Sequence, residues 1–404
     1  MTNSSFVTSL MTSKNNSEFR IPNFALDKGV INLIKLENVS KIYAGQDEAT
    51  IEGLNLEIQD GEICVLVGES GCGKTTTMRM INKVIPHTGG TIYVNGQDIS
   101  TISATELRLN IGYVIQEIGL FPHYTIEKNI ATVPMEKKWD KSRIAARVRE
   151  MMELVELDYD TYAKKKPRHL SGGQRQRVGV ARALAADPPI MLMDEPFGAL
   201  DPITRANLQN EFLRIQARIR KTIVFVTHDI DEAVKMGDKI AVMHQGKLVQ
   251  FGTPQDILTR PSDEFVENLV GDNRILKRFS LVECHQIKPS SSVFKLNGER
   301  DEIVKRIEGF VRTSSYPIIG ILDDNDRPIG YIPMFKYQPG DETSIEDRIV
   351  KFKSLQAINE NATLFDALGR LFSSSERCVY RMSNDGRCTG IITMADLFEA
   401  VRGK

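Results

Sequence analysis

The chain has 404 residues, 41% of them hydrophobic and 26% charged, and this length predicts two or three globular domains. Its 52 basic and 53 acidic side chains nearly cancel, which gives no electrostatic reason for binding nucleic acid or an anionic membrane. The five cysteines are scattered without a C-x-x-C pair, so we expect no disulfide framework or zinc site, and a reducing cytoplasm fits best.

The N-terminal residues 1–32 are rich in Ser, Asn and Thr and contain no basic segment followed by an apolar core. We therefore predict a disordered extension and not a signal peptide, with a docking segment as the alternative. Beyond it, no apolar run is long enough to cross a bilayer, so a role at a membrane requires a partner. The longest apolar runs have the length of buried strands and lie near Ile63–Val67, Ile190–Met193 and Ile223–Val226.

Strands and helices alternate from Leu33 to about Asp272. A helical stretch begins at Thr75, and Met78, Ile81 and Ile85 fall on one face of it. This alternation predicts a parallel sheet flanked by helices. The predicted strands are Leu33–Tyr43, Ile51–Ile58, Glu62–Val67, Ile190–Met193 and Thr222–Thr227.

A glycine-rich loop separates the third of these strands from the helix. Its sequence, Gly68-Glu69-Ser70-Gly71-Cys72-Gly73-Lys74-Thr75, fits G-x-x-x-x-G-K-[ST]. Glycines let the backbone N–H groups close around phosphate oxygens, and the start of the helix adds positive potential. We expect Lys74 to reach the β- and γ-phosphates of a nucleotide and the Thr75 hydroxyl to ligate Mg²⁺. Because the motif follows a strand and opens a helix, the sequence predicts a nucleoside triphosphate site.

A later strand delivers two carboxylates. Ile190–Met193 is followed directly by Asp194 and Glu195, and a pair at the end of a buried strand requires a cation or a water network. Beside a phosphate loop, Asp194 is expected to hold Mg²⁺ through its water shell. Glu195 is expected to act as general base for the attacking water. The alternative is a strand end that reaches solvent, where both side chains are ordinary surface groups.

The segment Leu170-Ser171-Gly172-Gly173-Gln174 opens a helical stretch that runs to about Ala186. Ser171 and Gln174 have the spacing of a capping box. A capping box does not explain the paired glycines, which weaken a helix start and expose N–H groups to a close ligand. We therefore expect a second phosphate contact here. If it cannot reach the phosphate loop of its own chain, the two must meet across a two-fold axis.

These motifs, in this order, resemble the nucleotide-binding domain of ABC transporters over about residues 33–272. The resemblance implies an α/β fold, the P-loop NTPase cassette with a RecA-like core plus antiparallel β and helical subdomains. It also implies an ATPase that works as a head-to-tail dimer with two ATP molecules and Mg²⁺ between the cassettes. The implied partners are integral-membrane permease subunits and, indirectly, an extracytoplasmic substrate-binding protein, with the ATPase at the cytoplasmic face of the membrane.

The resemblance also implies roles for individual residues. Tyr43 matches the aromatic side chain that stacks on adenine, Gln116 the glutamine that links the metal site to the permease, and His228 the histidine at the γ-phosphate. Asp201 belongs to the loop that crosses the dimer. Catalysis is thereby assigned to Glu195, His228 and Gln116, and metal binding to Thr75, Gln116 and Asp194. Nucleotide binding is assigned to Tyr43, Gly68, Glu69, Ser70, Gly71, Cys72, Gly73, Lys74, Thr75, Thr76, Ser171, Gly172, Gly173, Gln174 and Asp201.

The C-terminal part contains an internal repeat. Residues 324–332 (DNDRPIGYI) align with residues 384–392 (NDGRCTGII) at an offset of 60. A helical stretch and a β run precede each copy, which predicts two βαββα-like modules packed on one another. Two unrelated hairpins are the alternative, because Asp-Gly turns between apolar runs are common. The predicted boundaries are 33–272 for the cassette, 273–285 for a linker, and 286–343 and 344–404 for the two repeats.

The repeat resembles a pair of CBS (cystathionine-β-synthase) domains. In the second copy Thr393-Met394-Ala395-Asp396 matches the family's T-x-x-D motif, which makes Asp396 a candidate for accepting hydrogen bonds from a ribose. The first copy has Pro333-Met334-Phe335-Lys336 instead, without a carboxylate. The implied signal is an adenine nucleotide, including a cyclic adenine dinucleotide, or ionic strength. The alternative is a module that only stabilises the dimer.

Two segments narrow the resemblance among transporters. Residues 115–123 and 193–205 look like those of ATPases from glycine betaine/carnitine/choline importers, which often carry CBS domains. We therefore expect import of quaternary amine osmoprotectants, with another small solute such as an amino acid or a sugar as the alternative. A non-transport ABC ATPase of DNA repair or the ribosome is disfavoured, since the chain has one cassette and no basic patch. No residue of the chain argues physically for one solute, because an ATPase need not touch it.

Overall fold

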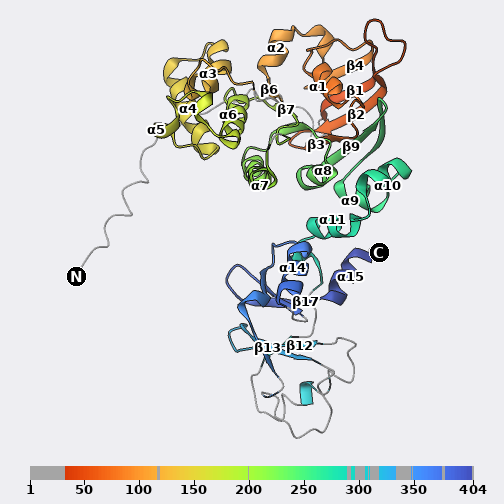
Figure 1. Cartoon of the computed structure of the whole chain (residues 1–404), viewed down its shortest axis with the longest axis vertical. Helices are drawn as coiled ribbons and strands as arrows, with labels where there is room; N and C mark the ends of the chain where they lie inside the picture. The colour runs from red at the N-terminus through yellow and green to blue at the C-terminus, as the bar shows by residue number, and fades with distance from the viewer. Residues whose placement is uncertain are drawn as a thin grey trace, which may run out of the picture.

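The structure is a computed structural model that describes residues 32–115, 119–198, 200–288, 293–295, 305–307, 309, 318–333, 347, 349–374 and 378–402. The predicted N-terminal extension, Gln116 and most of the first repeat's helical segment lie outside the described residues. Figure 1 shows the cassette in the upper part of the view and the C-terminal repeat below it.

A mostly parallel sheet forms the centre of the cassette. Its strand order is β10-β9-β3-β8-β7-β6, and all neighbours are parallel except β10 and β9. Every residue of β3, β7 and β8 is buried, as expected for strands covered by helices on both faces. The bounds are β3 Ile63–Val67, β6 Ile111–Val114, β7 Ile190–Asp194, β8 Thr222–Val226, β9 Lys239–His244 and β10 Lys247–Gly252.

A second, antiparallel sheet packs beside the first in the order β2-β1-β4-β5. Its inward side chains share one core with α1 and with alternate residues of the central strands, for example Ile34 with Met78 and Leu66. This sheet and the parallel sheet confirm the predicted fold class and the five predicted strands. The bounds are β1 Asn32–Lys41, β2 Ile51–Gln59, β4 Gly89–Val94 and β5 Gln97–Asp98.

The helices cover both faces of the central sheet and form a separate group around α3–α6 (Figure 1). One prediction was too long: α1 ends at Ile81, because Lys83 takes a left-handed φ of 50°. Ile85 still packs on the same core, but from the turn after the helix. The bounds are α1 Lys74–Ile81, α2 Ala104–Leu109, α3 Ile126–Glu136, α4 Lys141–Leu154, α5 Tyr159–Tyr162, α6 Gly172–Leu184, α7 Pro202–Ile219, α8 Ile230–Met236, α9 Pro254–Thr259 and α10 Glu264–Val270.

Helix α11 (Arg274–Leu281) occupies most of the segment predicted as a linker. It contacts α8 and α9 on one side and α14 and α15 on the other, and Figure 1 shows it between them. Phe279 is buried in the core of the second repeat, whereas Leu281 packs against the core of the cassette. The segment is therefore a packed helix that touches both parts of the chain.

The two repeats contain superimposable hairpins. In the first, Ile318 pairs with Pro333, and in the second, Cys378 pairs with Thr393, each partner shifted by 60 positions. A register shift follows Ile321 in one hairpin and Arg381 in the other, again 60 apart. This agreement confirms the internal repeat. The bounds are β11 Val293–Lys295, β12 Ile318–Leu322, β13 Pro328–Pro333, β14 Val350–Lys351, β15 Ala357–Asn359, α14 Leu364–Ser374, β16 Cys378–Met382, β17 Cys388–Thr393 and α15 Met394–Arg402.

The hairpins also pack on one another, as predicted. Tyr380 is buried and donates its hydroxyl hydrogen bond to the carbonyl of Gly330, and the N–H of Cys388 donates to the Asp326 carbonyl at 2.8 Å. Ile318, Tyr331 and Ile391 share one core with Tyr380. The two repeats thus form one unit in the residues that the structure describes.

Candidate active site

The glycine-rich loop lies at the carboxyl end of β3 and leads into α1, as the motif requires. Two of its glycines are dictated by close packing. A Cβ at Gly68 would lie 2.0 Å from the carbonyl oxygen of Met243, and one at Gly73 would lie 2.2 Å from Cδ1 of Ile51. Both residues also have positive φ, 151° and 103°. The loop backbone therefore presses against the two sheets, which fixes the position of the first turn of α1.

Lys74 turns its ammonium group back into this loop. Its Nζ donates to the carbonyl oxygens of Gly68 and Glu69, each at 2.8 Å, and the residue is only 6% exposed. Cys72 Sγ lies 3.7 Å from the same nitrogen, and burial raises the pKa of this thiol. A buried ammonium at the start of a helix, held by two loop carbonyl oxygens, is a suitable partner for phosphate oxygens.

Thr75 and Asp194 are in direct contact. The Thr75 hydroxyl donates to Oδ1 of Asp194 at 2.9 Å, joining the first turn of α1 to the end of β7. Burial raises the pKa of Asp194, while the hydrogen bond from Thr75 and the charge of Arg79 oppose that rise. A hard divalent cation prefers oxygen ligands such as a carboxylate and a hydroxyl group. A cation would also offset the burial of the Asp194 carboxylate. These residues therefore fit a Mg²⁺ ion.

Arg79 is a functional candidate that sequence reasoning did not single out. It lies one turn after Thr75 on α1, and its positive charge opposes the rise that burial causes in the pKa values of Asp194 and Tyr113. The spacing of four residues places Thr75 and Arg79 on the same face of the helix. The four-residue spacing from Thr75 is the sequence feature that could have identified Arg79.

Glu195 and His228 meet at the same edge of the sheet. Nδ1 of His228 lies 3.4 Å from Oε1 of Glu195, and the Glu195 N–H donates to the Val226 carbonyl at 3.0 Å. Glu195 has a left-handed φ of 43°, a backbone conformation that non-glycine residues adopt at a cost and that often marks functional sites. Their side chains are 23% and 59% exposed, so both reach solvent beside the buried Asp194. The parallel strands β7 and β8 bring the two together because their carboxyl ends coincide.

Tyr43 also lies beside the first turn of α1. Its hydroxyl is 3.4 Å from the Thr76 hydroxyl, and Nζ of Lys41 is 5.0 Å from the centre of its ring. Tyr43 thus lies at the loop–helix corner that carries Thr76 and Lys74. Gln116 lies outside the described residues.

Ser171 begins α6 in the predicted capping box. Its Oγ accepts from the Gln174 N–H at 3.2 Å, and its own N–H donates to Oε1 of Gln174 at 3.0 Å. Gln174 also donates to the Tyr162 hydroxyl at 3.1 Å. These bonds hold Ser171 within the helical group, not against the phosphate loop of its own chain. Packing also favours a glycine at position 173, since a Cβ there would lie 3.3 Å from Cγ2 of Thr204 on α7.

Asp201 is the N-cap of α7. Its side chain accepts from the Thr204 N–H at 3.1 Å, and hydrogen bonding from Thr204 lowers its pKa. The neighbouring residue 199 of the predicted dimer-crossing loop lies outside the described residues. Asp201 therefore has a local structural role in the single chain.

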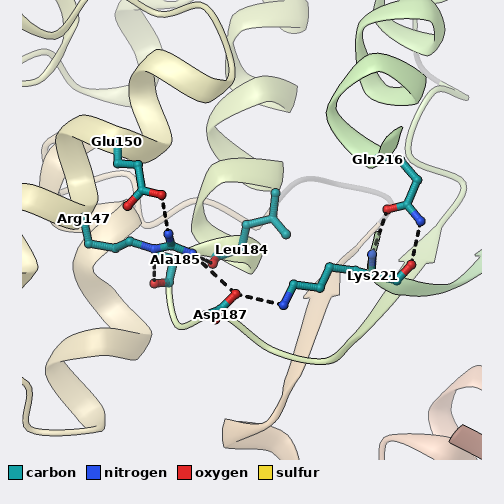
Figure 2. Close-up of polar contacts among 7 residues, drawn as sticks. All are labelled: Arg147, Glu150, Leu184, Ala185, Asp187, Gln216 and Lys221. Atoms are coloured by element: carbon teal, nitrogen blue, oxygen red, sulfur yellow. Dashed lines mark hydrogen bonds and ion pairs between the residues drawn. The ribbon is translucent and has the colours of Figure 1, made fainter. Parts of the chain in front are cut away.

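A polar network fixes the far end of α6 (Figure 2). Arg147 on α4 donates to the carbonyl oxygens of Leu184 and Ala185, at 3.1 and 3.0 Å, where α6 ends. Asp187 pairs with Lys221 at 2.8 Å, on the loop between α7 and β8. Burial disfavours the charged form of Asp187, but Lys221 and Arg147 outweigh it and lower its pKa. The helix that begins at Ser171 is thus tied to the helical group and to the central sheet.

Asp396 is engaged in a local bond of its own. Its Oδ2 accepts from the N–H and from the hydroxyl of Thr393, both at 2.7 Å, at the start of α15. Thr363 and Asp366 make the same arrangement at the start of α14. T-x-x-D is therefore a helix cap here, whatever ligand its second oxygen meets.

Family models match two parts of the chain. Residues 51–198 match the ABC transporter model, and residues 350–403 match the CBS domain model. The osmoprotectant import ATP-binding protein OsmV of Salmonella typhimurium is 41% identical over 89% of this chain and 94% of its own. The chain belongs to the ATP-binding proteins of ABC transporters. This ATPase therefore binds ATP and hydrolyses it to ADP and phosphate as part of a membrane transporter.

Two further relatives support the same family. The glycine betaine/carnitine/choline transport ATP-binding protein OpuCA of Bacillus subtilis is 39% identical to this ATPase over 91% of the chain and 96% of its own. The dimeric, post-hydrolysis structure of the cassette MJ0796 bound to ADP and Pi is 33% identical. It aligns with a TM-score of 0.50 over 55% of this chain and 98% of that one. Among the described residues of this ATPase, no helix is both long and apolar enough to span a membrane.

Proposed function

We propose that this ATPase drives the import of quaternary amine osmoprotectants such as glycine betaine, carnitine or choline. The observation that carries this proposal is the near full-length similarity to proteins named for those solutes, including the C-terminal repeat. An importer of another small solute, such as an amino acid or a sugar, is the alternative. A terminal β-barrel or ferredoxin-like domain would have favoured that alternative, and residues 350–403 match a CBS domain instead.

Uptake into vesicles tests the solute. The ATPase is reconstituted with its permease and substrate-binding protein, and ATP-dependent uptake of labelled glycine betaine, choline, a neutral amino acid and a sugar is measured. We expect uptake of at least one quaternary amine, competed by the others. Uptake of the amino acid or the sugar alone would establish the alternative.

We assign ATP binding to the corner where the phosphate loop, Tyr43 and α1 meet. Lys74 exchanges its bonds to the Gly68 and Glu69 carbonyls for bonds to phosphate oxygens, and Tyr43 stacks on the adenine. The Thr75 hydroxyl and Asp194 are the residues that would hold Mg²⁺, which takes few protein ligands when a nucleotide is bound. When bound, the ion neutralises charge on the phosphates.

The chemistry itself falls to Glu195 and His228. The Glu195 carboxylate takes the proton of a water molecule as that water attacks the γ-phosphorus, and the bond to the ADP oxygen breaks. His228, 3.4 Å from Glu195, donates a hydrogen bond to the γ-phosphate and holds the carboxylate in place. Gln116 links this site to the permease. A positioned base of this kind contributes a factor of about 10²–10⁴ to the rate.

The proposed working form is a head-to-tail dimer. Among the described residues, Ser171 bonds within the helical group and Gly173 packs on Thr204, so we infer that a second copy supplies this segment to the γ-phosphate. The dimeric arrangement of the related cassette supports this form. Each ATP then contacts Lys74 of one chain and Ser171 of the other.

We place the ATPase at the cytoplasmic face of the membrane, against the permease. Phe121 and Tyr124 are 46% and 45% exposed, and their rings lie 5.3 Å apart on the surface. A groove lined by Ile115, Phe121 and Arg182 adjoins them. An exposed aromatic pair beside a groove suits a helix of a partner. Cross-linking from Phe121 to a co-expressed permease is the test, and a link formed only by residues beyond 280 would overturn the assignment.

We also propose that the C-terminal repeat regulates the ATPase. Asp396 keeps one oxygen bonded to Thr393, so Oδ1 is the atom that a ribose hydroxyl of an adenine nucleotide or a cyclic adenine dinucleotide would meet. Ionic strength is the other candidate signal, and a module that only stabilises the dimer is the alternative. Titration of ATP, AMP and cyclic di-AMP against the full chain, with Asp396→Asn as control, distinguishes a nucleotide ligand from the other two.

A further inference from the structure

Three polar side chains join α7 to α8 beside the residues assigned to hydrolysis. Gln209 on α7 is 6% exposed, and Glu232 on α8 is 8% exposed. Nε2 of Gln209 donates to Oε1 of Glu232 at 2.9 Å, and Nζ of Lys235 donates to Oε1 of Gln209 at 3.0 Å. The Gln209 amide therefore bridges a carboxylate and an ammonium group that both belong to α8.

The buried carboxylate of this network depends on the bridge. Burial raises the pKa of Glu232, and hydrogen bonding from Thr227 and Gln209 and the charge of Arg205 oppose that rise. A buried carboxylate is costly unless donors satisfy it. Burial also lowers the pKa of Lys235, which the charge of Glu232 opposes. Each of these groups thus favours the arrangement in which α8 stays against α7.

The network holds the first turn of α8, which follows His228 closely in the chain. Glu232 lies in that turn, and α8 begins two residues after His228. The Asp229 side chain accepts from the Glu232 N–H at 3.4 Å, and the Asp229 N–H donates to the Thr227 hydroxyl at 3.1 Å. The two neighbours of His228 are therefore bonded to one another, and one of them is bonded to the turn that Gln209 holds.

Helix α7 is fixed to the segment that follows Glu195. Leu208 and Phe212 on α7 lie in the main core of the cassette together with Phe197. The rings of Phe212 and Phe197 meet edge to face, with 6.3 Å between their centres. Because Phe197 is two residues beyond Glu195, α7 packs directly on the segment that carries this carboxylate.

We propose that Gln209 is a positioning residue for ATP hydrolysis, whose amide ties α8 to α7 and thereby keeps Nδ1 of His228 beside Oε1 of Glu195, 3.4 Å away. This inference rests on the proposed role of His228 at the γ-phosphate. A network whose donors and acceptors are matched holds its helices in one arrangement. Hydrolysis needs that precision, because a misplacement of about 1 Å at the reacting groups costs up to about 10²-fold in rate.

Gln209→Met tests this role, with Gln216→Met as the matched control. Gln216 lies on the same helix, is 7% exposed and bonds the Lys221 backbone before β8, whereas His228 follows that strand. Both substitutions remove a buried, bonded amide and keep the length of the side chain, so we expect a similar fall in Tm. Only Gln209→Met should lower kcat, by about tenfold, the effect of one hydrogen bond. Affinity for ADP should not change, because ADP lacks the γ-phosphate.

A double-mutant cycle separates positioning from general damage. If Gln209 acts through His228, Gln209→Met should cause no further loss of single-turnover rate in the His228→Ala background. Lys235→Met lies on the exposed side of the network, so it should fold normally and lower kcat by a smaller factor, again only when His228 is present.

Two results would overturn the proposal alone: equal kcat values for the Gln209 and Gln216 variants, or the same fold-loss from Gln209→Met in both backgrounds. Wild-type turnover of His228→Ala would instead remove His228 from the mechanism, and this inference with it. The failure of the proposed role of His228 is thereby distinguished from the failure of Gln209 to position it.

Discussion

Asp194 and Glu195 are adjacent in sequence but have opposite surroundings. Asp194 is buried and bonded to Thr75, whereas the Glu195 side chain reaches solvent beside His228. The turn at Glu195, with its left-handed φ, is what sends the two carboxylates in different directions. One carboxylate is thereby suited to a cation and the other to a water molecule, which is the division of roles that hydrolysis requires.

Glu195→Gln isolates the role of the general base. The amide keeps the size of the side chain and can still contact His228, but it cannot take a proton from water. We expect ATP binding to persist, hydrolysis to fall by about 10²-fold or more, and the ATP-bound dimer to accumulate. Single-turnover hydrolysis and size-exclusion chromatography measure both effects. Exposed Glu153→Gln is the matched control, and a Glu195 variant with wild-type turnover would remove this residue from the mechanism.

Asp194→Asn tests the cost of the buried carboxylate. Because burial raises the pKa of Asp194, the folded chain binds its proton more tightly than the unfolded chain, so ionisation of Asp194 lowers stability. This loss is fully present at neutral pH and disappears as pH falls below the ordinary Asp pKa of about 3.9. Without nucleotide, we therefore expect the variant to have a higher Tm than the wild type at pH 7 and a smaller advantage at pH 4. Its hydrolysis should be lost. A lower Tm at pH 7 would contradict this argument.

Lys74, Asp194 and His228 follow or end the neighbouring parallel strands β3, β7 and β8, whose carboxyl ends lie at one edge of the sheet. The sequence assigned these three residues to one site, His228 through the family resemblance alone. It could not predict the local partner of Asp396, since T-x-x-D is equally a helix cap and a ligand motif. Nor does residue spacing reveal that Gly173 is needed for the approach of α7, because that contact joins elements that are distant in the chain.

At the scale of elements, α6 depends on bonds at both of its ends. The capping box of Ser171 and Gln174 satisfies donors at its start, and Arg147 satisfies carbonyl oxygens at its end (Figure 2). A positive charge there also interacts favourably with the helix dipole. The position of Ser171 in the helical group therefore rests partly on a contact at the opposite end of the helix.

Arg147→Met should loosen this helix. The substitution leaves the Leu184 and Ala185 carbonyls without their charged donor while keeping the apolar stem of the side chain. We expect the free energy of unfolding to fall by about 2 kcal/mol, from hydrogen bonds to a charged group. Urea denaturation measures it, with exposed Lys141→Met on the same helix as the control. Equal losses in the two variants would show that the network in Figure 2 adds no stability.

Helix α11 was the element that sequence reasoning did not find. Its apolar residues Ile275, Leu276 and Phe279 lie on one face at the spacing i, i+1 and i+4, so an amphipathic pattern was present in the sequence and was overlooked. Phe279 and Leu281 pack on two different cores, which periodicity alone does not reveal. Strands were easier to place, because runs such as Ile63–Val67 are apolar throughout.

At the scale of the whole molecule, the proposed dimer predicts complementation between two inactive variants. Lys74→Ala removes the phosphate contact, and Ser171→Arg blocks the surface offered to the other chain. Each variant alone should be inactive. A mixed dimer contains one intact site, so random pairing should restore about a quarter of wild-type hydrolysis.

The control for this experiment is the double variant. Lys74→Ala mixed with a chain that carries both substitutions can form no intact site, and it should stay inactive. Steady-state ATP turnover of the two mixtures and of each single variant is the measurement. Wild-type turnover from either single variant alone would exclude sites shared between chains.

Helix α11 connects the repeat to the part of the cassette near His228. Lys277 on α11 pairs with Asp231 on α8 at 2.8 Å, and α8 begins two residues after His228. Lys277 is 16% exposed and Asp231 66%, so the pair is accessible to salt. The Debye length falls from about 10 Å at 0.1 M to about 3 Å at 1 M salt, which weakens such a pair. If ionic strength is the signal of the regulatory module, this ion pair is a contact through which it acts on the cassette.

Lys277→Met should therefore flatten the dependence of transport on ionic strength. The coupling free energy between two sites of a protein is typically about 1–3 kcal/mol, which corresponds to a change in affinity of about 5- to 150-fold. Loss of such a response is therefore measurable. Uptake into reconstituted vesicles is followed from 0.1 to 1 M salt for the wild type and the variant. Arg274→Met is the matched control, because Arg274 lies on the same helix and pairs with Glu267 at 3.0 Å, not with α8. Identical salt curves for all three proteins would mean that α11 joins the two domains without transmitting a signal between them.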